Sequence, residues 1–118
     1  MPFGKLCTQN YPNQYEQTLV FSVLKYTETH YKSGTLADIA DELNQETYYI
    51  SRLLKKHTGA NFKELLQQRK LQQAVYLLKQ TSLTIDSIIE AIGYDNSSYF
   101  YRKFKEKYHC SPKEYRRD

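Results

Sequence analysis

The sequence predicts an all-α fold in which two helix-turn-helix units are joined by one long helix. The first observation is an apolar stripe over residues 85–92, where isoleucine recurs at the spacing of one helix face. A similar stripe over residues 36–43 is the second, and a long helical pattern over residues 61–80 between the two is the third. Four further helices are expected: one before the first stripe, one after each stripe, and one at the C-terminal end. The sequence therefore predicts seven helices.

The second unit, residues 83–117, has the clearer signals. Its first helix ends at Gly93, because glycine adopts a positive φ at little cost. A second helix follows a few polar residues later and buries Phe100 and Phe104. The opposite face of this second helix carries Ser98, Tyr101, Arg102 and Lys105. A helix that is buried on one side and presents such side chains on the other suits a DNA major groove.

The helix signals in the sequence are weaker before and within the first unit than in the second unit. Residues 1–11 lack helical periodicity and are interpreted as a linker or tail. The first unit, residues 12–58, opens with a helix after Pro12 that is expected to end near Tyr31. Asn13 and Glu16 are placed to form the capping box of this helix.

Two further helices complete the first unit. Thr35 is a plausible cap for the first of them, and residues 44–46 form the turn. The next helix is expected over residues 47–57, ended by Thr58 and Gly59.

The two units can be aligned with each other. The stripe that begins at Leu36 recurs 49 positions later at Ile85, whereas Arg52 recurs 50 positions later at Arg102, so the second unit has one extra residue in its turn. The exposed residues that align on this second spacing are Tyr48, Ser51, Arg52 and Lys55 with Ser98, Tyr101, Arg102 and Lys105. Core stripes are needed for folding, but paired arginines are not, and their repetition indicates a function.

The long helix lies between the units. Asn61 is expected to cap it and Glu64 to complete a capping box. A helix over residues 62–80 spans ~27 Å. One turn of B-DNA is ~34 Å, so two recognition helices held this far apart could enter successive major grooves.

The last helix is expected to begin after Ser111, with Pro112 at its first position and Glu114 completing a capping box. Arg116 and Arg117 follow, and the sequence leaves open whether they contact phosphate or are simply solvated.

Charge is distributed unevenly along the chain. Residues 1–50 sum to −3 and residues 51–118 to +7, which together give the net charge of +4. A basic region within one domain is what phosphate binding requires, although a lysine-rich solvated surface is the plainer interpretation of charge alone.

Several other functions lack support in the sequence. No apolar run is long enough for a membrane span and no secretory signal is visible, so a cytoplasmic protein is expected. Cys7 and Cys110 are interpreted as free thiols, with a disulfide as the alternative. The three histidines have no metal-ligand spacing, and no phosphate-binding loop or nucleophile motif is present, so neither a cofactor nor an enzymatic activity is expected.

Residues 35–117 resemble the DNA-binding domain of the AraC/XylS family of transcription regulators. The most specific matching residues are Gly93-Tyr94, Ser98-Tyr99-Phe100, Phe104-Lys105, Ser111-Pro112 and Tyr115-Arg116. The first unit matches through Ser51-Arg52, Leu54-Lys55-Lys56 and Thr58-Gly59, and the long helix through Leu66, Lys70, Leu71 and Ala74. The departures are Tyr94 and Leu54 for phenylalanine, Glu46 for a serine cap, Ile89 for a small residue and His109 for a glycine.

The resemblance implies two homeodomain-like units that read adjacent major grooves of bacterial promoter DNA. It also implies activation or repression, in some cases through RNA polymerase. The residues it places on base edges are Tyr48, Ser51, Arg52, Ser97, Ser98, Tyr101 and Arg102. The candidates for phosphate contacts are Thr47, Lys55, Asn96, Lys105 and Arg116. The linker-like start suggests an excised C-terminal domain, monomeric by itself, with a sensing and dimerising domain upstream in the full-length protein.

Two alternatives are kept open. The acidic first half and Glu46 are compatible with a protein-interaction module that contacts RNA polymerase or another regulator without reading DNA sequence. An enzyme is the other, but any catalytic part would lie outside this chain.

Overall fold

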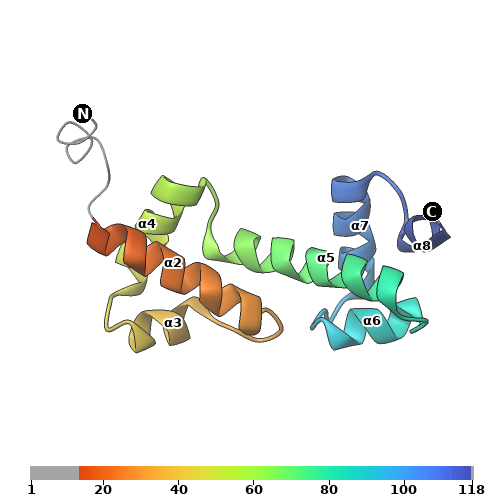
Figure 1. Cartoon of the computed structure of the whole chain (residues 1–118), viewed down its shortest axis with the longest axis horizontal. Coiled ribbons are helices and arrows are strands. Elements are labelled where there is room, and N and C mark those ends of the chain that lie inside the picture. The colour runs from red at the N-terminus through yellow and green to blue at the C-terminus, as the bar shows by residue number, and fades with distance from the viewer. Residues whose placement is uncertain (1–13, 118) are drawn as a thin grey trace. The chain divides into compact units, whose positions relative to one another are not determined.

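The computed structural model describes residues 14–117 of the 118-residue chain. The predicted tail over residues 1–11, the proposed cap Asn13 and one of the two cysteines, Cys7, lie outside the described residues. The described part contains seven helices and no strand, which confirms the predicted all-α fold (Figure 1). The helices are α2 (Gln14–Thr29), α3 (Leu36–Glu42), α4 (Thr47–Thr58), α5 (Phe62–Gln80), α6 (Ile85–Ala91), α7 (Ser97–Tyr108) and α8 (Pro112–Arg117).

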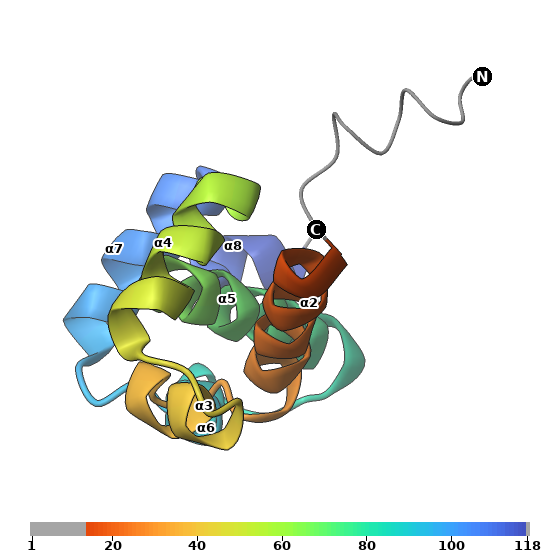
Figure 2. The same cartoon turned by 90° about the vertical axis from the view of Figure 1, so that its left-hand side faces the viewer.

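The first compact unit comprises residues 14–29 and 34–62 and contains α2, α3 and α4 (Figure 2). Each helix contributes a buried apolar face, because its apolar residues recur every three or four positions. The buried side chains are Leu19, Val20, Val23, Tyr26 and Thr27 of α2, Ile39 and Ala40 of α3, and Ile50, Leu53 and Leu54 of α4. Phe62 joins this core beside Tyr26, with 6.3 Å between the ring centroids.

The second compact unit comprises residues 30–33 and 63–117, in which α6, α7 and α8 gather around the C-terminal half of α5 (Figure 1). Its core consists of Leu71, Ala74, Leu78, Ile88, Ile89, Ile92, Tyr94, Phe100 and Phe104. Phe104 also contacts Tyr108 and Tyr115, at 4.7 and 5.7 Å between ring centroids. Tyr31 packs against the same core, and α2 ends at Thr29, two residues before the position near which its end is predicted.

Both units turn between their helices through the same backbone motif. In the first, Asn44 has a φ of 59°, and the N–H groups of Asn44 and Gln45 donate to Asp41 and Ala40. In the second, Gly93 has a φ of 88°, and the N–H groups of residues 93 and 94 donate to residues 90 and 89. These paired bonds define a Schellman motif, which satisfies the last carbonyls of α3 and α6.

The one-residue difference between the units lies after this motif. Glu46 caps α4 directly behind Gln45, whereas Asp95 separates Tyr94 from Asn96, which caps α7. The extra residue predicted from the two alignment spacings is therefore Asp95.

Two of the predicted caps form, at Thr35 and at Ser111. Asp38 N–H donates to the Thr35 hydroxyl at 3.0 Å. Ser111 and Glu114 make the reciprocal bonds of a capping box, at 2.9 and 3.1 Å. Gly59 ends α4 with a φ of 79°, and His109 adopts the matching left-handed conformation after α7, with a φ of 63°. Histidine is among the few non-glycine residues enriched in this region, so the departure from glycine leaves the helix end intact.

Candidate nucleic-acid interface

The predicted face of α4 is open to solvent at its critical positions. Tyr48 is 70% exposed, Arg52 and Lys55 are exposed, and Ser51 is half-buried. The Arg52 guanidinium lies 5.7 Å from the centre of the Tyr48 ring. This cation–π contact holds the arginine along the exposed side of the helix without using its N–H donors.

The corresponding face of α7 is also open. Its exposed residues are Ser97, Ser98, Tyr101, Arg102 and Lys105. Tyr101, Arg102, Lys105 and Glu106 line a shallow depression on the helix surface. The Arg102 guanidinium lies 5.1 Å from the ring of Tyr99, a residue that packs against Tyr94 at the turn. The two aligned arginines are thus supported by tyrosines at different positions of their helices.

The first turns of α4 and α7 differ in charge. Asn96 accepts a hydrogen bond from Tyr99 N–H at 3.1 Å and is a complete N-cap. Glu46 occupies the capping position of α4 without a side-chain capping bond, just before Thr47. Its carboxylate interacts favourably with the helix dipole, but it would repel an anion approaching the same helix end.

Arg116, predicted to contact phosphate, has a structural role that the sequence analysis missed. Its Nε donates to the Leu78 carbonyl at 3.1 Å, and a terminal nitrogen donates to the Thr81 carbonyl at 3.2 Å. These bonds join α8 to the end of α5, where carbonyls lack helical partners. An arginine is suited to bond the free carbonyls at a helix end, so the residue type itself is a signal for this role. The carbonyls that Arg116 bonds lie 35 to 38 residues away in the sequence, and local patterns do not identify them. The phosphate contact stays a prediction.

The turns behind both faces are held by side chains that the sequence analysis did not single out for this role. Gln45 donates to the hydroxyl of Tyr15 on α2, and Tyr94 donates to the side-chain oxygen of Gln67 on α5. Lys70 donates to the Gly93 carbonyl at 3.1 Å. Burial lowers the pKa of Lys70, and the charge of nearby Asp95 offsets part of this effect. The amine is therefore committed to the turn that precedes α7.

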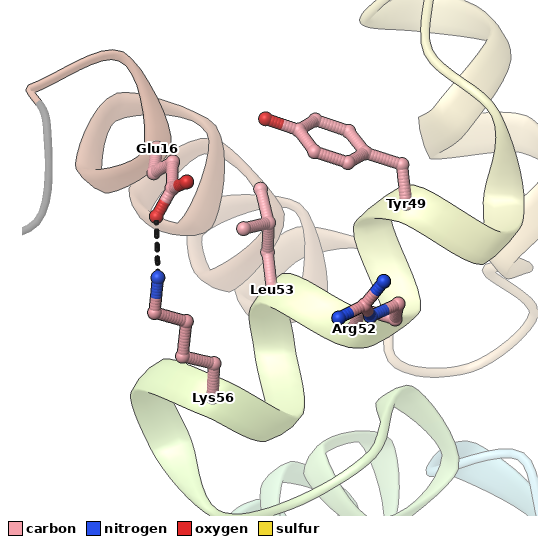
Figure 3. A pocket seen from close by; sticks show the side chains of 5 residues that line it. All are labelled: Glu16, Tyr49, Arg52, Leu53 and Lys56. Carbon is pink, nitrogen blue, oxygen red and sulfur yellow. Dashed lines mark hydrogen bonds and ion pairs between the residues drawn. The ribbon is translucent and has the colours of Figure 1, made fainter.

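A pocket of about 350 Å³ lies on the flank of α4 that faces α2 (Figure 3). Glu16, Tyr49, Arg52, Leu53 and Lys56 line it. Oε1 of Glu16 lies 3.2 Å from Nζ of Lys56 and 3.2 Å from Nε2 of His57. The hydrogen bonds from His57 and then from Lys56 lower the pKa of Glu16, so the carboxylate is ionised near neutral pH.

The described residues contain neither a metal-binding cluster nor a membrane-spanning helix. Within residues 14–117, no three His, Cys, Asp or Glu side chains gather in a way that could hold a metal ion. None of the helices in that range is long and apolar enough to cross a membrane.

A helix-turn-helix domain family model matches residues 39–118. The regulatory protein PocR of Salmonella typhimurium is 31% identical over 94 residues, which cover 79% of this chain. The chain spans only 25–38% of the length of PocR and two other curated regulators.

Solved structures share the fold. The C-terminal domain of AraT, a response regulator from Geobacillus stearothermophilus, is 36% identical with a TM-score of 0.76, and the alignment covers 84% of each chain. The DNA-binding domain of the global transcriptional factor AdpA, solved with a target DNA, has a TM-score of 0.73 at 19% identity and covers 83% of this chain and 88% of its own. The chain belongs to the AraC/XylS family of transcription regulators and corresponds to their helix-turn-helix DNA-binding domain.

Proposed function

We propose that the chain binds double-stranded promoter DNA sequence-specifically, with α4 and α7 inserted into adjacent major grooves. The observation that carries this proposal is the repetition of one exposed face on both helices. Each face presents a tyrosine, a serine, an arginine and a lysine within two helical turns. The related AdpA domain, solved with its target DNA, supports the same use of the fold.

The arginines are the proposed readers of sequence. Arg52 and Arg102 are exposed, and each rests on a tyrosine ring that leaves its N–H groups available. A guanidinium in the major groove makes two parallel hydrogen bonds to guanine O6 and N7. We propose that Tyr48 and Tyr101 contact thymine methyl groups or phosphate, and that Ser51, Ser97 and Ser98 bond base edges.

Phosphate contacts would fix the position of each helix in its groove. We propose that these contacts come from Lys55 and Lys105, which end the exposed faces, and from the backbone N–H groups at the helix starts beside Thr47 and Asn96. Such contacts release counterions, so binding should weaken steeply as salt is added.

The test begins with selection of bound sites from a random pool of duplex DNA. Arg102→Ala should weaken binding to the selected site by ~1–3 kcal/mol and relax the preference at one base position. Lys107→Ala is the matched control, because Lys107 is an exposed cation of the same helix whose Nζ lies 6.0 Å from the centre of the Tyr108 ring, away from the residues of the exposed face. Unchanged affinity and preference in Arg102→Ala would remove the proposed role of this arginine.

The spacing of the two grooves can be tested on the DNA. A duplex with about five base pairs inserted between the two half-sites turns the second groove to the opposite side of the helix axis. We expect affinity to fall to that of a single half-site. Equal binding to both duplexes would mean that the units do not engage one face of the DNA together.

A second candidate, a module that contacts RNA polymerase or another regulator, is favoured by Glu46, whose carboxylate stands at the start of α4 without a capping bond. This candidate predicts no sequence preference in the selection, so the same experiment separates the two. DNA binding and protein contact are compatible roles if the acidic residues of the first unit contact the partner protein while α7 binds DNA.

A further inference from the structure

Lys56 is a cation of α4 that is paired with an acid from another helix. Its Nζ lies 3.2 Å from Oε1 of Glu16 on α2, and the two side chains are 60% and 17% exposed (Figure 3). The acid is therefore held in the protein surface, while the lysine remains accessible. An ion pair with one exposed partner is weak, so the lysine can exchange its carboxylate for another anion.

The position of Lys56 on α4 is suited to contact with the DNA backbone. It follows Arg52 by four residues, so the two side chains lie on the same side of the helix, one turn apart. Both line the pocket on the flank of α4. When a helix enters a major groove, side chains on its flanks meet the sugar–phosphate walls, and a cation there neutralises phosphate.

Glu16 opposes this contact in two ways. Its carboxylate pairs with Lys56 in the free protein, and its negative charge would repel a phosphate that approaches this lysine. His57, 14% exposed and also 3.2 Å from Oε1 of Glu16, anchors the acid from the other side. The acid is therefore held in place when Lys56 moves.

The second unit lacks this arrangement. The residue 50 positions after Lys56 is Glu106, which accepts a hydrogen bond from Lys103 of the same helix at 3.4 Å. The acid of the second unit thus belongs to α7 itself, and no cation stands at the position that corresponds to Lys56.

We infer that Glu16 limits the affinity of the first unit for DNA by competing with phosphate for Lys56. This inference rests on the proposed insertion of α4 into the major groove. It assigns Glu16 a role in function that opposes its role in folding, because the same ion pair joins α2 to α4.

The experiment compares Glu16→Gln with the unaltered protein on the selected duplex and on a random duplex. Glu16→Gln should raise affinity about two- to fivefold at low salt, the fold-change that corresponds to one exposed ion pair. The slope of log K against log salt should become steeper by about 0.9, since one further counterion is released. Thermal stability should fall in the same variant, whereas a purely structural role would lower stability and DNA binding together.

Two further variants control the result. Glu28→Gln removes the same charge from an exposed position of the same helix and should leave the slope unchanged. Adding Lys56→Met to Glu16→Gln should abolish the gain in affinity and slope. A slope that does not change in Glu16→Gln, or a gain that persists in the double variant, would overturn the inference.

Failure of the proposed function gives a different result. In that case the selected and random duplexes bind equally and Arg102→Ala has no effect, whatever the slope of Glu16→Gln.

Discussion

The two helix-turn-helix units secure their turns with the same pair of side-chain types in exchanged positions. In the first unit the supporting helix provides the tyrosine, Tyr15, and the turn provides Gln45. In the second unit the supporting helix provides Gln67 and the turn provides Tyr94. The backbone motif is the same in both, so different side chains serve one geometry.

The exchange changes how firmly each turn is held. The Tyr15–Gln45 bond is exposed, whereas the Tyr94–Gln67 bond is partly buried and the Tyr94 ring also lies 5.0 Å from the Lys70 amine. A hydrogen bond away from water competes with fewer alternatives. The comparison therefore predicts that substitutions at the turn affect the second unit more than the first.

The largest expected effect concerns the left-handed residue of each turn. In Gly93→Ala, the added Cβ would lie 2.9 Å from the backbone oxygen of Lys32, at a φ of 88°. The positive φ costs about 1–2 kcal/mol and the clash about 1–3 kcal/mol, so we expect a loss of about 2–5 kcal/mol. Urea unfolding measures the loss.

The matched change in the first unit is Asn44→Ala at a φ of 59°. Asparagine tolerates this region through its short polar side chain, so alanine should cost only about 1–2 kcal/mol there. Equal losses in the two variants would mean that the turns are supported alike.

An intermediate effect is expected from exchanging the caps of the two recognition helices. Glu46→Asn gives α4 the cap that Asn96 provides for α7 and should raise stability by about 0.5–1 kcal/mol, the capping gain less the lost interaction with the helix dipole. It should also strengthen DNA binding by removing a carboxylate, and Asn96→Glu should weaken it. Thermal unfolding and titration with the selected duplex check both. If the two exchanges shift affinity in the same direction, cap charge does not distinguish the units.

The smallest effect is expected at alkaline pH. Burial raises the pKa of Tyr94 and of Tyr108, and the nearby Tyr99 and Tyr115 add to the respective shifts. The unfolded chain releases these protons near pH 10 while the folded chain retains them, so stability falls as pH rises above 10. The loss should stay below about 1 kcal/mol per tyrosine at pH 10.5, because that pH lies only about half a unit above the pKa of a tyrosine in the unfolded chain.

The lowered pKa of Lys70 has the opposite effect on stability. The folded chain releases the Lys70 proton at a lower pH than the unfolded chain, so stability rises with pH until the unfolded lysine also releases its proton near pH 10.5. Tyr94→Phe should flatten the alkaline decline measured by chemical unfolding between pH 9 and 11. A decline of the same size in that variant would assign the effect to groups other than Tyr94.

The fold could be predicted from sequence because its signals are local. The stripe that begins at Ile85, the glycine at position 93 and the capping box at Ser111 each act within one or two helical turns. The long helix was predicted with the bounds that the structure gives, Phe62–Gln80. The exposure of Arg52 and Arg102 followed from the same periodicity, because the residues opposite a buried stripe face solvent.

What the sequence did not reveal depends on distant partners. Arg116 bonds carbonyls of Leu78 and Thr81, and Glu16 bonds a lysine 40 positions away. The sequence predicts a local capping role for Glu16, and this role stays a prediction because its partner, Asn13, lies outside the described residues. Pairing between side chains of different helices requires the packing itself, which periodicity does not specify.

The extra residue at position 95 has a consequence for genetic exchange between the two halves of this chain. A crossover that joins the α6 turn to α4 would omit one residue, and the reverse crossover would add one. Both changes fall between the turn and the N-cap of the following helix, so they alter where that helix starts relative to the core and leave the spacing of its residues unchanged. A hybrid would therefore have to pack the recognition helix of one unit against the core of the other with a helix start that differs by one residue.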